Sequence, residues 1–162
     1  MSPKLDRHDL RILTGLQHDG RITKARLAEV AGLSATPAWA RLKRLDQAGL
    51  IESWGARVAL RKLAPVTEVI VQVTLANHRA ADFQVFEDAM RRTPEVVACD
   101  ATGGGVDYIL RLLVRNVDAY QRLMDRLLED RIGIERYFGY FVTKPVKMAP
   151  PDLSLLLDPT ED

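Results

Sequence analysis

The sequence is poor in the residues that build disulfide-braced or metal-braced folds. It has one cysteine, Cys99, and three histidines that do not cluster among its 162 residues. A single cysteine excludes an intrachain disulfide framework and a multi-cysteine zinc site. No nucleophile with a neighbouring base stands out either. We therefore expect no metal site, no cofactor and no catalytic residues.

Long hydrophobic runs are also missing. No stretch of about 18 apolar residues is present to form a membrane-spanning helix, and the first six residues lack the apolar core of a secretion signal. Apolar residues make up 47% of the chain and charged residues 28%, which is typical of a globular protein. We expect a cytoplasmic protein without a membrane partner.

Charge is unevenly distributed, although the net charge is only +1. Residues 1–62 contain 12 Lys and Arg against 6 Asp and Glu, whereas residues 63–162 contain 11 against 16. A basic first part followed by an acidic second part indicates a nucleic-acid-binding domain joined to a module with another task.

The basic part carries start and stop signals for three helices. Asp6 and Thr23 are good N-caps for the first two. Gly32 fits a left-handed C-cap, and Ser34 follows as the N-cap of a third helix that ends before Gly49. Two helices joined by so short a glycine-containing turn predict a helix-turn-helix.

The third helix has two different faces. At 100° per residue, Ala38, Leu42 and Leu45 fall together and should face the other helices. Trp39 lies on the flank, where it could pack beside the core or against DNA. Polar and basic side chains on the remaining face are of the kind that binds phosphates and base edges in the major groove. The residues that point away from the core are Thr36, Ala40, Lys43, Arg44 and Gln47.

The acidic part alternates strands and helices in the order βαββαβ. We expect strands over 69–75, 96–101, 106–115 and 134–143, and helices over 82–92 and 118–130. This order is that of a ferredoxin-like domain, in which right-handed crossovers place both helices on one face of an antiparallel sheet. The fold class is therefore α+β.

The segment between the two parts is rich in β-branched and aromatic residues. Residues 50–58 predict a short strand or hairpin, as in a winged helix, with Trp54 packed beneath it. The expected organisation is a helix-turn-helix domain over 1–52, a wing or linker strand over 53–65, a ferredoxin-like domain over 66–148 and a C-terminal tail over 149–162.

The sheet face away from the helices should be apolar. It carries Ile70 and, on the last strand, either Ile134, Phe138 and Tyr140 or Tyr137 and Phe141. An apolar face needs a covering surface, and we expect a second copy of the chain in a symmetric homodimer.

Several stretches resemble the bacterial and archaeal Lrp/AsnC family, the leucine-responsive or feast/famine transcription regulators. They are LDRHDLRIL from residue 5, GRI from 20, LA from 27, GLS from 32, RLKRL from 41, GLI from 49 and TGGGVDY from 102. The resemblance implies a winged helix-turn-helix domain joined to a ligand-sensing domain of ferredoxin-like, RAM-type fold. It also implies dimers that can assemble into octamers, and small effectors, commonly amino acids, bound between subunits at the last of these stretches.

The resemblance also implies site residues. Positions that match the family's DNA-contacting residues are Ser34, Thr36, Pro37, Ala40, Arg41 and Arg44, to which the outer face of the helix adds Lys43 and Gln47. On the helical wheel, however, Arg41 lies beside the core. The partner is double-stranded DNA, with a palindromic operator expected for a dimer.

The effector would be bordered by Thr102, Gly103, Gly105, Asp107 and Tyr108. Glycine amides can bind a carboxylate at close range, and a carboxylate such as Asp107 can pair with an ammonium. Both features suit an amino-acid-like effector that modulates DNA binding or assembly.

An enzyme of the sirohaem decarboxylase type, which processes tetrapyrroles, is similar in architecture and remains the alternative. In that reading His78, Arg111 and Arg115 would hold propionate or acetate groups. The basic outer face of the third helix favours DNA. The sequence therefore predicts a DNA-binding regulator of amino-acid or related metabolism, not an enzyme.

Overall fold

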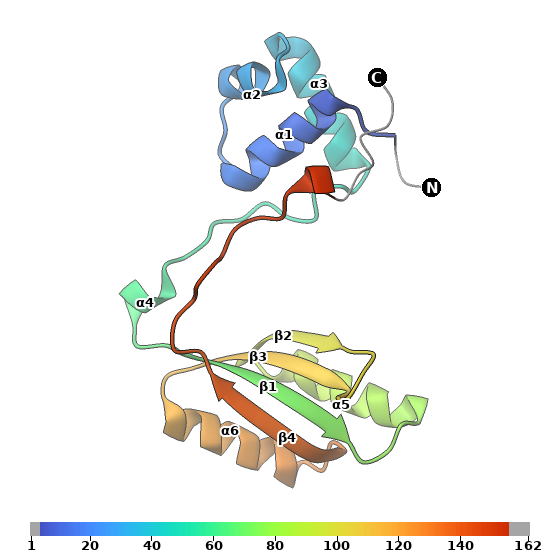
Figure 1. Ribbon diagram of the computed structural model, residues 1–162, viewed down its shortest axis with the longest axis vertical. Helices are drawn as coiled ribbons and strands as arrows, with labels where there is room; N and C mark the ends of the chain where they lie inside the picture. The colour runs from blue at the N-terminus through green and yellow to red at the C-terminus, as the bar shows by residue number, and fades with distance from the viewer. Residues whose placement is uncertain (1–3, 156–162) are drawn as a thin grey trace. The chain divides into compact units, whose positions relative to one another are not determined.

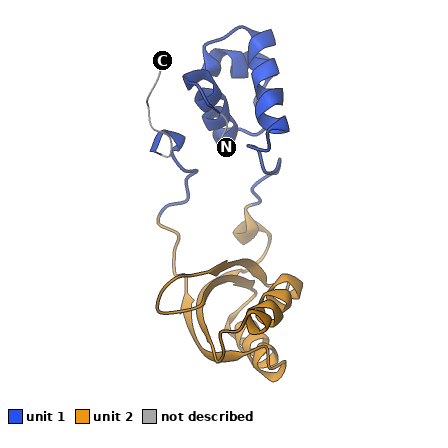
Figure 2. Ribbon diagram, turned by 90° about the vertical axis from the view of Figure 1, so that its right-hand side faces the viewer, with its two compact units in different colours: residues 1–58, 147–162 blue, residues 59–146 orange. Residues whose placement is uncertain are grey.

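A computed structural model describes residues 4–155 (Figure 1). The chain divides into two compact units (Figure 2). One contains residues up to 58 together with residues from 147 onward, and the other contains residues 59–146. Among the described residues, no helix has both the length and the apolar character needed to cross a membrane.

The first unit is built on three helices, α1 (Arg7–His18), α2 (Lys24–Ala31) and α3 (Ala35–Gln47). Two of the predicted N-caps are formed by side chains: Asp6 accepts hydrogen bonds at the start of α1, and Thr23 does so at the start of α2. Ser34 stands at the N-cap position of α3, but its side chain makes no capping hydrogen bond. Gly32 ends α2 with φ of 67°, a left-handed conformation that glycine adopts at little cost. The short turn between α2 and α3 is thus confirmed.

The core of this unit is apolar and comes from all three helices. Ala38, Leu42 and Leu45 of α3 are buried as predicted, and they pack against Ile12 of α1 together with Leu27, Ala28 and Ala31 of α2. Trp39 is half-buried against this core, and Nζ of Lys24 lies 4.5 Å from the centroid of its ring. Of the two expectations for Trp39, packing beside the core is the one observed.

The strand expected within residues 50–58 does not form. Residues 50–59 have no regular structure, and a short helix, α4 (Leu60–Leu63), follows them. A strand needs a neighbouring strand to pair its backbone N–H and C=O groups, and no described strand pairs with this segment. Trp54 is also half exposed instead of packed beneath the segment, with its Nε1 3.4 Å from Asp46.

The second unit is a four-stranded antiparallel sheet with two long helices on one face (Figure 2). Its elements are β1 (Thr67–Leu75), α5 (Ala80–Arg92), β2 (Val96–Ala101), β3 (Tyr108–Val114), α6 (Val117–Glu129) and β4 (Ile134–Phe141). The strand order is β2-β3-β1-β4, with every neighbouring pair antiparallel. The predicted βαββαβ fold is confirmed.

Alternation along the strands decides which side chains lie between sheet and helices. Alternate residues of β1 and β3 are buried, and they pack against Phe86 and Met90 of α5 and against Leu123, Met124 and Leu127 of α6. The buried strand residues are Val69, Val71, Val73, Leu75, Tyr108, Leu110, Leu112 and Val114.

The register of β4 decides which of its residues lie on the open face. Tyr140 is registered with Ile70, so it and Phe138 lie on the face away from the helices. A register shift near the end of β1 pairs Ile134 with Leu75, which belongs to the core. The expectation that grouped Ile134 with Phe138 and Tyr140 is therefore wrong for Ile134, because a β-bulge moves a residue to the other face.

Part of the predicted C-terminal tail, 149–162, is described. A single 3-10 turn, η1 (Leu153–Leu155), lies beside α1. Residues 156–162 lie outside the described part of the chain.

Candidate nucleic-acid interface and effector site

The outer face of α3 is open to solvent. Seven of the eight residues predicted to contact DNA are exposed, and the eighth, Arg41, is partly buried. The exposed ones are Ser34, Thr36, Pro37, Ala40, Lys43, Arg44 and Gln47. The diameter of an α-helix suits the major groove of B-DNA. This surface therefore has the shape and the donor groups to approach base edges.

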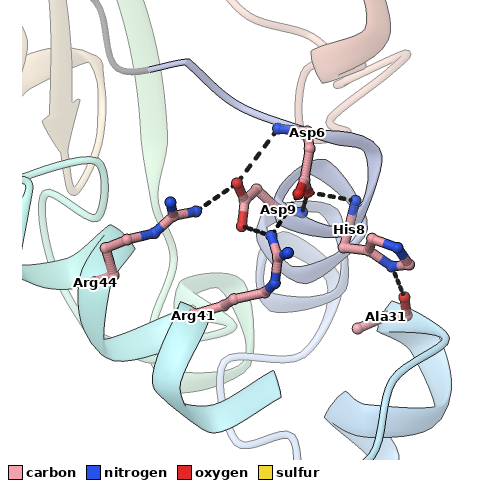
Figure 3. Close-up of polar contacts among 6 residues, drawn as sticks. All are labelled: Asp6, His8, Asp9, Ala31, Arg41 and Arg44. Carbon is pink, nitrogen blue, oxygen red and sulfur yellow. Dashed lines mark hydrogen bonds and ion pairs between the residues drawn. The ribbon is translucent and has the colours of Figure 1, made fainter. Parts of the chain in front are cut away.

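Arg41 is directed towards α1, which agrees with its place beside the core on the helical wheel. Its Nη1 lies 2.6 Å from Oδ2 of Asp6 and 2.9 Å from Oδ1 of Asp9 (Figure 3). The hydrogen bonds to Asp6 and Asp9 raise the pKa of Arg41 above its ordinary value. Arg41 therefore ties α3 to the start of α1.

Arg44 is held by the same cluster but remains more accessible. Its Nη2 lies 2.5 Å from Oδ2 of Asp9, and its side chain is 58% exposed. Asp9 is not among the site residues that the sequence predicted. The three-residue spacing between Asp6 and Asp9 is the signal for their mutual capping, since the backbone N–H of each approaches the carboxylate of the other. Nothing in the sequence alone brings Asp9 to α3.

The glycine-rich loop between β2 and β3 is closed by short bonds at its base. The backbone N–H of Thr102 donates to the carbonyl of Asp107 at 2.9 Å, and its hydroxyl donates to the carbonyl of Val106 at 2.5 Å. Gly103 and Gly105 are exposed, and no other atom lies within 4 Å of where their Cβ atoms would stand. A side chain at either position would therefore stand in open space.

Asp107 joins the base of this loop to the end of β1. Its Oδ2 accepts a hydrogen bond from the backbone N–H of Leu75 at 2.7 Å, and its Oδ1 lies 3.0 Å from Nε2 of His78. The carboxylate is only 18% exposed. Nε2 of His78 also lies 3.1 Å from Oδ2, so the imidazole contacts both carboxylate oxygens.

Tyr108 lies beneath the loop and not at its open edge. Its side chain is buried, its ring centroid is 4.6 Å from that of Phe86, and its hydroxyl donates to Oε1 of Glu87 at 3.0 Å. Burial, reinforced by the hydrogen bond to Glu87, raises the pKa of Tyr108 to about 12. It also lines a cavity of about 410 Å³ between α5 and β2, in which Cys99 is a neighbour. Within one protomer, the Tyr108 side chain therefore packs against α5 in the core.

Two of the three groups named for the enzyme alternative, His78 and Arg111, already have carboxylate partners. His78 contacts Asp107, and Arg111 is bonded to Glu68. Within residues 4–155, no group of three or more His, Cys, Asp and Glu side chains is placed to hold a metal ion.

Comparison with known families decides between the two readings. Residues 5–52 match the family described as winged helix-turn-helix DNA-binding, and residues 68–152 match the Lrp/AsnC ligand binding domain. The chain belongs to the Lrp/AsnC family. It is therefore a DNA-binding transcriptional regulator with a ligand-binding domain, and the enzyme alternative is set aside because the relatives are regulators.

Similar proteins extend over nearly the whole chain. The transcriptional regulatory protein DoeX of Halomonas elongata is 49% identical over 152 residues, which cover 94% of this chain and 96% of DoeX. The leucine-responsive regulatory protein of Escherichia coli is 35% identical over 146 residues, 90% of this chain and 88% of that protein.

Solved structures of regulators share the fold. A transcriptional regulator from Neisseria meningitidis in complex with L-Met is 29% identical, with a TM-score of 0.87, and the match covers 95% of this chain and all of that one. An AsnC family regulator from Agrobacterium tumefaciens is 30% identical, with the same TM-score and coverage of 94% and 100%.

Proposed function

We propose that this Lrp/AsnC regulator binds palindromic operators through the outer face of α3 and responds to an amino-acid-like effector at the glycine-rich loop. The observation that carries the DNA-binding site is the exposure of the predicted face, in which seven of eight residues are accessible on a helix that follows a tight turn. Lys43 and Arg44 supply positive charge, whereas Thr36 and Gln47 supply neutral donors and acceptors.

The proposed assembly is a homodimer through the open face of the sheet, or an octamer built from such dimers. Phe138 and Tyr140 are 50% and 53% exposed on that face, and burial of such side chains stabilises association. A two-fold axis would present two α3 helices to half-sites about one helical turn apart, which is why a palindromic operator is expected. The proposed location is the cytoplasm.

An amino acid is the effector class that the loop chemistry supports. The backbone amides of the exposed residues Gly103 and Gly105 suit its carboxylate, while Asp107 suits its ammonium. The hydrogen bond from the Thr102 hydroxyl to Val106 closes the loop. The Neisseria relative, in whose crystal structure L-Met is bound, supports the same class. The effector acts if its affinity differs between two assembly states that present the α3 helices differently.

The test of DNA binding begins with selection of duplexes from a random library by the wild-type chain. Replacing Lys43 with Ala should weaken binding to the selected duplex and reduce the slope of log affinity against log salt by about one, because one phosphate contact is lost. Fluorescence anisotropy at several salt concentrations measures both quantities.

Lys144→Ala is the matched control, since it removes an exposed lysine beyond the end of β4. It should leave affinity and slope unchanged. Failure of the wild-type chain to enrich any duplex at low ionic strength would overturn the proposed function. An identical response of the two variants would remove the outer face of α3 from the interface.

A further inference from the structure

The carboxylate of Asp9 lies inside the N-terminal unit and binds two arginines of α3. Its side chain is 1% exposed, and no other charged side chain of the described residues is buried. Its Oδ1 accepts from Nη1 of Arg41 at 2.9 Å, and its Oδ2 accepts from Nη2 of Arg44 at 2.5 Å (Figure 3). Burial of a carboxylate costs free energy unless hydrogen bonds and opposite charges compensate for the lost hydration. The two arginines are therefore firmly held.

The two arginines differ in how much of each guanidinium is accessible to DNA. Arg41 is bracketed by two carboxylates, because its Nη1 also donates to Asp6 at 2.6 Å, and its side chain is 30% exposed. Arg44 has Asp9 as its carboxylate partner and is 58% exposed. A guanidinium has five N–H donors, so the single bond to Asp9 leaves most of those of Arg44 available to DNA.

We propose that Asp9 is a positioning residue for sequence recognition: it holds Arg44 in the orientation that reads a base edge and restrains it from binding the nearest phosphate. This inference rests on the proposed function of α3. Arg41 has a structural role, since it joins Asp9 and Asp6 to α3 and has the smaller exposure of the two arginines.

The bond between Asp9 and Arg44 favours sequence specificity in DNA binding for two physical reasons. A guanidinium already held by a carboxylate loses less side-chain entropy when it binds a base. Its charge is also partly neutralised, so its attraction to phosphates, which is the same for every sequence, is reduced. A free arginine at the same position would bind all duplexes more tightly and discriminate less among them.

The test is the ratio of two affinities, one for a duplex that the wild-type chain selects from a random library and one for a scrambled duplex of the same composition. Asp9→Asn keeps the shape of the side chain but releases Arg44. We expect tighter binding to the scrambled duplex and weaker binding to the selected one, with a fall in the ratio on the order of tenfold, the size of one lost base contact. A purely structural role of Asp9 would lower both affinities equally and leave the ratio unchanged.

Two further variants separate this effect from a change in net charge. Glu29→Gln alters the charge equally and releases Arg26 from an exposed ion pair of 2.7 Å in the same unit, and it should leave the ratio unchanged. In an Arg44→Ala background, adding Asp9→Asn should leave the ratio within about twofold, because Asp9 acts through Arg44.

Each outcome bears on the proposal. A constant affinity ratio for Asp9→Asn, an equal fall in the ratio for Glu29→Gln, or additive effects of Asp9→Asn and Arg44→Ala on the ratio would overturn it.

If Asp9→Asn fails to fold, Asp9→Glu replaces it. That variant keeps the charge but displaces Arg44, so the ratio should fall while binding to the scrambled duplex is unchanged, and a constant ratio there overturns the proposal too. If the wild-type chain selects no duplex, the proposed function fails before this inference is reached.

Discussion

Asp107 has a structural role within the protomer that does not depend on an effector. It accepts a hydrogen bond from Leu75 at the end of β1 and contacts His78, so its orientation is set within the chain. A ligand ammonium would meet a carboxylate that is already in position, which lowers the entropic cost of binding. An ammonium must also share this carboxylate with His78.

Asp107→Asn should therefore weaken effector binding by about tenfold or more, since a hydrogen bond to a charged group typically contributes about 1.5–3 kcal/mol. The amide oxygen can still accept from Leu75, so the loop should keep its shape. The ligand for this measurement is the L-amino acid that raises the wild-type Tm most in a thermal screen, and calorimetry then compares the proteins. Asp100→Asn, an exposed carboxylate on β2, is the control, and equal affinities for the wild type and Asp107→Asn would contradict the site.

At the scale of single elements, β4 is shaped by its contact with α6. Gly139 is registered with Val71 on the helix side of the sheet, directly over Tyr120. A Cβ at this position would overlap the Tyr120 hydroxyl. The ring of Tyr120 is buried and meets Phe141 edge-on at 5.3 Å between centroids, so it cannot easily move away.

Gly139→Ala should accordingly destabilise the second unit by about 1–3 kcal/mol, the usual cost of overpacking. The expected observation is a lower Tm in thermal unfolding followed by circular dichroism. Gly104→Ala is the matched control, because its Cβ would meet no atom within 4 Å and its backbone is not left-handed. An unchanged Tm for Gly139→Ala would show that Tyr120 has room to shift.

At the scale of the whole molecule, the open face of the sheet bears on assembly. The helices cover only one face, and Phe138 and Tyr140 remain half exposed on the other. If this face forms the proposed dimer contact, a charge introduced at its centre would be buried without a partner. Burial of an unpaired charge costs free energy and opposes association.

Phe138→Glu should dissociate the proposed dimer into monomers and weaken operator binding, because two linked half-site contacts become one. Sedimentation velocity measures the assembly state. Leu128→Glu introduces the same charge at an exposed leucine of α6 and should sediment like the wild type. A wild-type mass for Phe138→Glu would exclude the sheet face as the dimer contact.

Local signals in the sequence were sufficient for most elements. Asp6, Thr23 and Gly32 bound the helices of the first unit as predicted, because caps and left-handed turns depend on neighbours in the chain. Alternation of apolar residues likewise predicted a strand within residues 106–115, where β3 lies. The exposed face of α3 followed from helical geometry alone, and with it most of the candidate DNA-binding residues.

Contacts between residues far apart in the sequence decided the features that local signals could not predict. The pairing of Asp9 with Arg44 joins residues 35 positions apart, and the contact of Asp107 with His78 joins residues 29 apart. The bulge that turns Ile134 to the helix side depends on how β4 meets β1. Periodicity along the chain determines what each element can bury, but only packing brings a carboxylate to an arginine on another helix and decides which side chains remain free to bind.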